Sequence, residues 1–316
     1  MLAVNAKVKA VRLTSLMSLC SWTMVPELQI QKADKMSEKI HPELLRILEG
    51  EMALWVRARI GHLPDEAKFR ANNALTALYW AGGISTLHSS LDRKYRFSVP
   101  ATFCLTHALE EAVVAFVGCA SAGEYKNLTD KFSIGNHKYK SALSWVITEI
   151  MNIVSNEFAL ALTYSKIQDR IIVRFDDEGE TNYAPASLKL LSMKNADGER
   201  TKSFVEDIYA SYANEDAALR YLQHMANGRN VLMYATDESY MSGPDDMTYN
   251  LRELSKTTLG VLWATIDLWE NKDERLQLVD IFLQTAVDLA KSASRLRNKE
   301  EQERKKANGA SPGPGI

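Results

Sequence analysis

A histidine and two glutamates interrupt an otherwise apolar stretch of the chain, the segment 99–123. His107 lies three residues before Glu110 and four before Glu111, so a helix would carry the imidazole and at least one carboxylate on one face. An unpaired carboxylate among apolar side chains is costly. The pattern therefore predicts that a cation or a polar cleft meets Glu110. A structural ion pair and a site with pKa values tuned for chemistry both satisfy this requirement.

A second group of polar residues is basic and begins a later helix. His137, Lys138 and Lys140 fall in the opening turn of a helix that the apolar spacing predicts from Lys138 to about Tyr164, with Asn136 as its N-cap. Cations are disfavoured at a helix N-terminus because the helix dipole is positive there. We therefore expect an anion beside this cluster, either a neighbouring carboxylate or a bound phosphate, unless the helix start is simply solvated.

The segment that carries the two glutamates is predicted to be the central helix of a bundle. Pro100 suits the first turn of a helix, and Gly118 and Gly123 offer places for it to end. Apolar side chains lie on all sides of this helix, which is typical of a buried element. They include the following residues at helical spacing: Phe103, Leu105, Leu109, Val113, Val114, Phe116 and Val117.

The composition indicates an ordinary globular chain. Of the 316 residues, 46% are hydrophobic and 25% are charged, and the formal net charge is −2, so nothing favours a nucleic-acid coat or a membrane-surface protein. The sequence shows no uninterrupted apolar run of membrane-spanning length. Three cysteines without disulfide or metal spacing are typical of the reducing cytoplasm.

Helix follows helix along most of the chain. The apolar periodicity predicts helices at about 42–61, 64–91, 99–123, 138–164, 203–225, 257–269 and 273–306, with another helix starting at Pro244. Two β-prone runs, 171–175 and 231–236, could pair as a small ribbon. The predicted fold class is all-α with a small β-ribbon insertion. The predicted divisions are a loosely attached extension at 1–36, a single helical domain at 37–300 with a mixed α/β insertion at about 168–250, and a charged, Gly/Pro-rich tail at 301–316.

Common enzyme motifs are missing from the sequence. It has no phosphate-binding G-x-x-x-x-G-K-[ST] loop, no H-E-x-x-H, no G-x-S-x-G and no paired E-x-x-H. Arg57 and His62 form a short pair that could serve RNA cleavage, although such a pair arises easily by chance.

Three segments, taken in order, resemble the AbiV-type abortive-infection proteins, which are placed among the HEPN helical proteins of prokaryotic defence. The first is FSVPATFCLTHALEEAVVAFV, which is similar to the family's helix with a small residue followed by Leu-Glu-Glu. The second is the basic cluster NHKYK. The third is RNVLMYATDESYMSGPDDMT, which resembles the family's Lys/Arg-x-x-x-x-Tyr-x-x-Asp segment. The order of the three segments is a stronger argument than any one of them.

The resemblance implies a HEPN-like multi-helix bundle and metal-independent RNA cleavage, in which the ribose 2′-hydroxyl attacks the adjacent phosphate. No cofactor or metal is implied. The implied catalytic residues are His137, Glu110, Glu111 and Lys140, with Lys138, Arg57 and His107 as RNA or phosphate contacts and Arg229, Tyr234 and Asp237 at the cleft or a partner surface. The implied partners are a second copy of the chain, an RNA substrate, and a phage-encoded activator or cognate inhibitor protein, with no membrane.

One position departs from the family pattern. The family commonly has a lysine where this sequence has Val114. Another cation, Lys138, Lys140 or Arg57, is therefore required to meet Glu110, or the site has lost part of its chemistry. This departure keeps a second hypothesis open, a non-catalytic helical sensor, adaptor or inhibitor. A small-ligand or nucleotide-binding bundle is a third.

Overall fold

The computed structural model describes residues 41–90, 98–158, 161–177, 180–190, 200–233 and 244–309. This part of the chain is mostly helical, which confirms the all-α prediction at the level of fold class. The longer helices are α1 (Pro42–Leu48), α2 (Glu51–Arg59), α3 (Asp65–Ser90), α4 (Ser98–Ala122), α6 (His137–Phe158), α7 (Val205–Ala210), α8 (Glu215–Met233), α9 (Pro244–Glu270) and α10 (Gln277–Gly309). The short elements are η2 (Ile60–His62), α5 (Lys126–Thr129), η3 (Leu188–Leu190) and strands β1 (Ala161–Ser165), β2 (Arg170–Asp177) and β3 (Glu180–Pro185).

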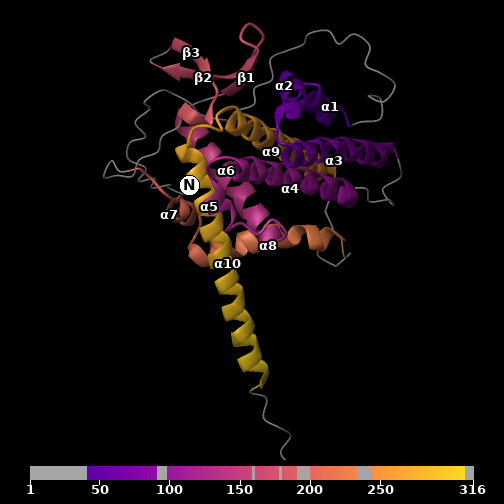
Figure 1. The fold of residues 1–316 in the computed structure, drawn as a ribbon. Coiled ribbons are helices and arrows are strands. Elements are labelled where there is room, and N and C mark those ends of the chain that lie inside the picture. Colours follow the sequence, from indigo (N-terminus) through magenta and orange to yellow (C-terminus); the bar gives the residue numbers. More distant parts are fainter. Residues whose placement is uncertain are drawn as a thin grey trace, which may run out of the picture.

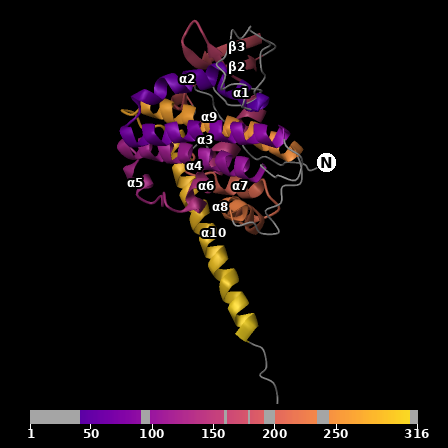
Figure 2. The same cartoon turned by 90° about the vertical axis from the view of Figure 1, so that its right-hand side faces the viewer.

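Helix α4 lies at the centre of the bundle, as the sequence predicts. It packs against α3, α9, α6 and α8, and α3 and α4 run side by side in both views (Figure 1 and Figure 2). Leu105, Val113 and Phe116 are fully buried. Their burial at helical spacing explains why the segment forms a core helix, because apolar residues on every side need neighbours on every side.

The same helix is long and apolar enough to cross a membrane when length and composition alone are considered. Within the structure, however, most of its apolar window is covered by the other helices. A core helix of a soluble protein has these properties too, and burial of the window favours this assignment.

Two predicted helices are each divided in the structure. The predicted helix at 42–61 breaks at Gly50, which is the N-cap of α2. A Cβ at Gly50 would lie 3.1 Å from the carbonyl oxygen of Arg46, so the glycine allows a tight turn between α1 and α2. The predicted helix at 203–225 is likewise divided into α7 and α8. Conversely, the two segments predicted from Pro244 and at 257–269 form the single helix α9.

The prediction that the runs 171–175 and 231–236 pair with each other is wrong. Strand β2 contains the predicted run 171–175, but it pairs with β1 and β3 in an antiparallel sheet of order β1-β2-β3. The described part of the other run, 231–233, continues α8 as helix. The predicted end of the helix at 138–164 is also wrong, because α6 ends at Phe158 and residues 161–165 form β1. At 231–233 the surrounding packing overrides local β propensity, whereas at 161–165 pairing with β2 replaces the predicted helix by a strand.

Figure 1 shows the sheet at one end of the molecule and α10 extending well beyond the other helices at the opposite end. Leu296 is the last buried apolar residue of α10, and residues 301–306 are exposed. The helix therefore continues into the segment predicted as a charged tail. Residues 1–40, which include the predicted extension, and residues 310–316 lie outside the described residues.

Candidate functional site

The site is built from the middle of α4 and the first turn of α6. Asn136 caps α6, since its side-chain oxygen accepts a hydrogen bond from the backbone N–H of Lys138 at 3.0 Å. His137 and Lys140 are three residues apart and therefore lie on the same face of α6, which is turned toward α4. Lys138 lies on a different face, because each residue turns the helix by about 100°.

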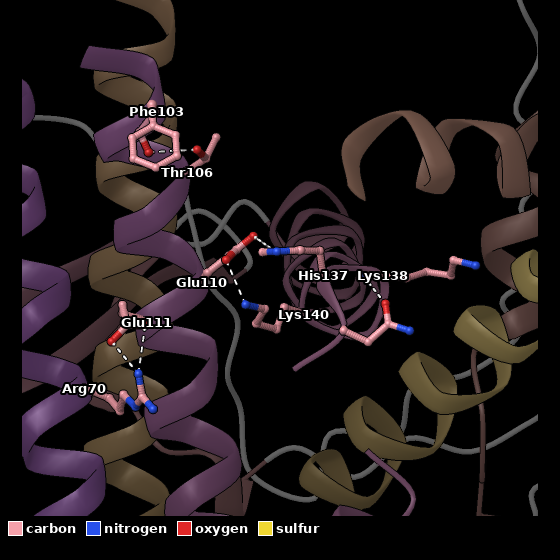
Figure 3. Close-up of polar contacts among 9 residues, drawn as sticks. Arg70, Phe103, Thr106, Glu110, Glu111, His137, Lys138 and Lys140 are labelled. Atoms are coloured by element: carbon pink, nitrogen blue, oxygen red, sulfur yellow. Dashed lines mark hydrogen bonds and ion pairs between the residues drawn. The ribbon is translucent and has the colours of Figure 1, made fainter. Parts of the chain in front are cut away.

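Glu110 accepts hydrogen bonds from both basic residues (Figure 3). Its Oε1 atom lies 2.7 Å from Nδ1 of His137, and its Oε2 atom lies 2.8 Å from Nζ of Lys140. The side chains of Glu110 and Lys140 are 12% and 11% exposed, whereas that of His137 is 33% exposed. The predicted cation for Glu110 is thus Lys140, and the imidazole is the member of the cluster that solvent reaches most easily.

The electrostatics of the cluster keep Glu110 ionised. Burial by itself favours the neutral acid and raises the pKa of Glu110. The hydrogen bond and charge of Lys140, followed by those of His137, outweigh burial and hold this pKa below its ordinary value. A carboxylate that remains charged beside Nδ1 fixes the tautomer of the ring, with Nδ1 protonated and Nε2 as the basic nitrogen.

Glu111 projects to the other side of α4 and meets α3. Nη1 of Arg70 lies 3.2 Å from both carboxylate oxygens (Figure 3). Nδ2 of Asn73 donates to Oε2 at 3.2 Å. Glu111 is 6% exposed. The structure therefore brings His137 and Lys140 to Glu110 and gives Glu111 a separate cation.

Lys138 turns away from Glu110 toward α10. Its Nζ atom donates to Oγ of Ser294 at 3.0 Å. Burial, and then the positive charge of Arg297, lower the pKa of Lys138. Of the three basic residues predicted at this helix start, two meet the carboxylate and the third contacts a hydroxyl near another cation.

The remaining predicted contact residues have other surroundings. His107 is stacked on Phe103, with ring centroids 6.3 Å apart and planes 5° apart. Arg57 donates to the Leu48 carbonyl oxygen at 3.0 Å and also to the Tyr79 hydroxyl, over whose ring its guanidinium lies. These contacts tie α2 to α1 and α3 rather than to the turn that bears His137.

The third predicted segment is largely outside the structural description. Arg229 belongs to α8, but its side chain is not described. Tyr234 and Asp237 lie outside the described residues. Their predicted role at a cleft or partner surface stays a prediction.

Sequence reasoning missed Arg70 and Asn73, the partners of Glu111. Both lie in the helix predicted at 64–91, and their spacing of three residues places them on one face, which is a signal that the sequence contains. Within the ranges that the structure describes, no group of three or more His, Cys, Asp or Glu side chains has the arrangement of a metal site.

Comparison with known protein families, curated proteins and solved structures gives no match to this chain. The side chains of the site, their geometry and the resemblance of the three segments remain as the observations that bear on function.

Proposed function

We propose that this chain is a metal-independent endoribonuclease of the HEPN type that acts in the cytoplasm as an abortive-infection effector against phage. The observation that carries the proposal is the hydrogen bond of 2.7 Å between Glu110 and Nδ1 of His137, in a cluster where only the imidazole is substantially exposed. A carboxylate–imidazole pair of this kind is a general base whose orientation is fixed before substrate arrives.

The proposed reaction follows from the tautomer of His137, in which Nδ1 carries the proton and Nε2 can accept one. Nε2 of His137 accepts the proton of a ribose 2′-hydroxyl, and the 2′-oxygen attacks the adjacent phosphorus. The bond from phosphorus to the 5′-oxygen breaks, and the imidazolium of His137 gives its proton to that oxygen, so the products carry a 2′,3′-cyclic phosphate and a 5′-hydroxyl. Glu110 stabilises the imidazolium that forms, and it is a positioning residue because it acts through His137.

Lys140 has a different role in this scheme. Its ammonium bonds to Glu110 at 2.8 Å and is nearly buried, so it compensates the carboxylate and adds positive charge near the reacting phosphate. The family pattern has a lysine at the position of Val114. In this chain Lys140 is proposed to supply that positive charge. The resemblance further supports a homodimer and a phage-encoded activator or cognate inhibitor as partners.

The proposal is tested by incubating the purified chain with a mixed single-stranded RNA in EDTA and identifying the fragment ends. We expect cleavage with cyclic phosphate ends, and its loss in His137→Ala. The matched control is His224→Ala, because His224 is an exposed histidine on α8. Full cleavage by a folded His137→Ala protein would refute the role of His137.

A non-catalytic interaction protein is the second candidate function. The observation that favours it is a pair of large exposed side chains on α3, Phe69 and Trp80, each 60% exposed. They are eleven residues apart, which places them on the same face of the helix. This candidate predicts no RNA cleavage by the wild-type chain and a stable complex with a protein partner that Trp80→Ala weakens.

A further inference from the structure

A cavity lies between the turn that joins β1 to β2 and the ends of α2 and α9. It consists of two adjoining hollows, of about 450 and 370 Å³, which share Arg59, Asp169 and Glu270 in their walls. The residues of the proposed cleavage site, His137, Glu110 and Lys140, line neither hollow, whereas His62 lies in the wall of the second. The volumes are in the range of small-molecule sites.

Asp169 lines both hollows, and its hydrogen bonds fix its position. Its φ is 45°, in the left-handed region that costs free energy for a residue with a side chain. Nε1 of Trp55 donates to its carbonyl oxygen at 3.2 Å, and Arg59 donates to its carbonyl and carboxylate oxygens at 3.0 and 2.9 Å. The Tyr164 hydroxyl donates to its other carboxylate oxygen at 2.7 Å. The three bonds from Trp55 and Arg59 hold the turn against α2, and the bond from Tyr164 ties it to β1.

The cavity also contains a planar stacking surface. The guanidinium of Arg59 lies over the ring of Trp55, with 4.4 Å between its central carbon and the ring centroid. Trp269 lines the adjoining hollow. Guanidinium planes and indole rings are the surfaces on which proteins stack nucleobases.

Two charged groups of the cavity complement different parts of a nucleotide. Glu270 is 50% exposed, and its Oε1 atom is 3.7 Å from Nε of Arg59, a loose ion pair that leaves the carboxylate able to accept further hydrogen bonds. Guanine offers two adjacent donors on its Watson–Crick edge, whereas adenine offers a donor and an acceptor. Arg170 lines the same hollow and is exposed, in a position to bind a phosphate.

We propose that this cavity binds a guanine mononucleotide. The base stacks on the layer formed by Arg59 and Trp55, Glu270 accepts the two N–H groups of its edge, and Arg170 binds the phosphate. This inference goes beyond the proposed RNA cleavage and stands or falls separately from it, because its residues belong to other elements and its readout is binding.

The test is isothermal titration of the full chain with GMP, AMP and guanosine. We expect GMP to bind at least tenfold more tightly than AMP or guanosine. Glu270→Gln should weaken GMP binding at least tenfold and reduce the preference for guanine, because an amide presents one donor and one acceptor, which suits adenine. Arg170→Gln should weaken GMP binding to the level of guanosine.

The matched control is Glu274→Gln. Glu274 lies just beyond α9, is half exposed like Glu270 and pairs with Lys189 outside the cavity. Its substitution should leave GMP binding unchanged. Absence of GMP binding, equal affinity for GMP and AMP, or full GMP affinity in Glu270→Gln would each overturn the proposal.

Discussion

Two adjacent carboxylates on α4 have opposite surroundings. Glu110 faces the opening turn of α6 and meets a lysine and a histidine, whereas Glu111 faces α3 and meets an arginine and an asparagine. Both side chains are nearly buried. A guanidinium can only donate hydrogen bonds, whereas a neutral imidazole has one nitrogen that donates and one that accepts. Burial of a carboxylate therefore does not by itself identify a catalytic site. The side chain that pairs with the carboxylate distinguishes a candidate catalytic site from a structural ion pair.

Glu110→Gln has the largest expected effect, and the effect is on activity. The amide cannot stabilise an imidazolium, so RNA cleavage should fall by about 100-fold or more while the chain stays folded. The measurement is kcat/KM for RNA cleavage in EDTA, with circular dichroism to check the fold. Unchanged cleavage would place Glu110 among the structural residues with Glu111.

Glu111→Ala should act on stability. It leaves the Arg70 guanidinium, which is 35% exposed, without its carboxylate, so the free energy of unfolding should fall by about 2 kcal/mol. Urea unfolding measures this change. Cleavage per folded molecule should be close to that of the wild type, and a loss comparable with that of Glu110→Gln would remove the distinction between the two carboxylates.

The pH dependence of stability sharpens the same comparison. Because the pKa of Glu110 is held below its ordinary value of 4.5, its ionised form stabilises the fold at higher pH, and this contribution is lost as the pH falls through the folded pKa. The stability difference between wild type and Glu110→Gln should therefore shrink as the pH falls below 4.5.

Asp267 also makes the stability of the protein depend on pH. For this reason the test uses the difference in stability between wild type and Glu110→Gln, not the stability of either protein alone. Burial raises its pKa to about 6, although hydrogen bonds from the Leu188 N–H and the Ser187 hydroxyl oppose this shift. Its contribution has the opposite sign, because stability is lost as the pH rises through 6. It is common to both proteins and cancels in the difference. A difference that grows below pH 4.5 would contradict the assignment for Glu110.

Lys138→Gln has the smallest expected effect. Its ammonium contacts Ser294 rather than Glu110, so catalysis by the cluster should change less than threefold on a dinucleotide substrate. The corresponding change Lys140→Gln should cost much more, because it removes a charge that Glu110 needs. Equal losses for the two lysines would show that position on the helix turn does not matter.

The sequence predicts the central helix and the meeting of Glu110 with a cation, because each follows from a local cost: apolar faces need cover and a buried carboxylate needs a partner. It does not select Lys140 over Arg57, because the alignment of one helix against another depends on packing between distant segments. The run 231–233 becomes helix for the same reason. The left-handed Asp169 had no signal in the sequence, since hydrogen bonds from α2, more than a hundred residues away, hold it.

The most direct test of the account is a double-mutant cycle on RNA cleavage between Glu110→Gln and His137→Ala. If Glu110 acts through the imidazole, the double variant should cleave RNA no more slowly than His137→Ala alone, because the carboxylate has nothing left to orient. Losses in kcat/KM that multiply in the double variant, or wild-type protein that cleaves no RNA in EDTA, would contradict it.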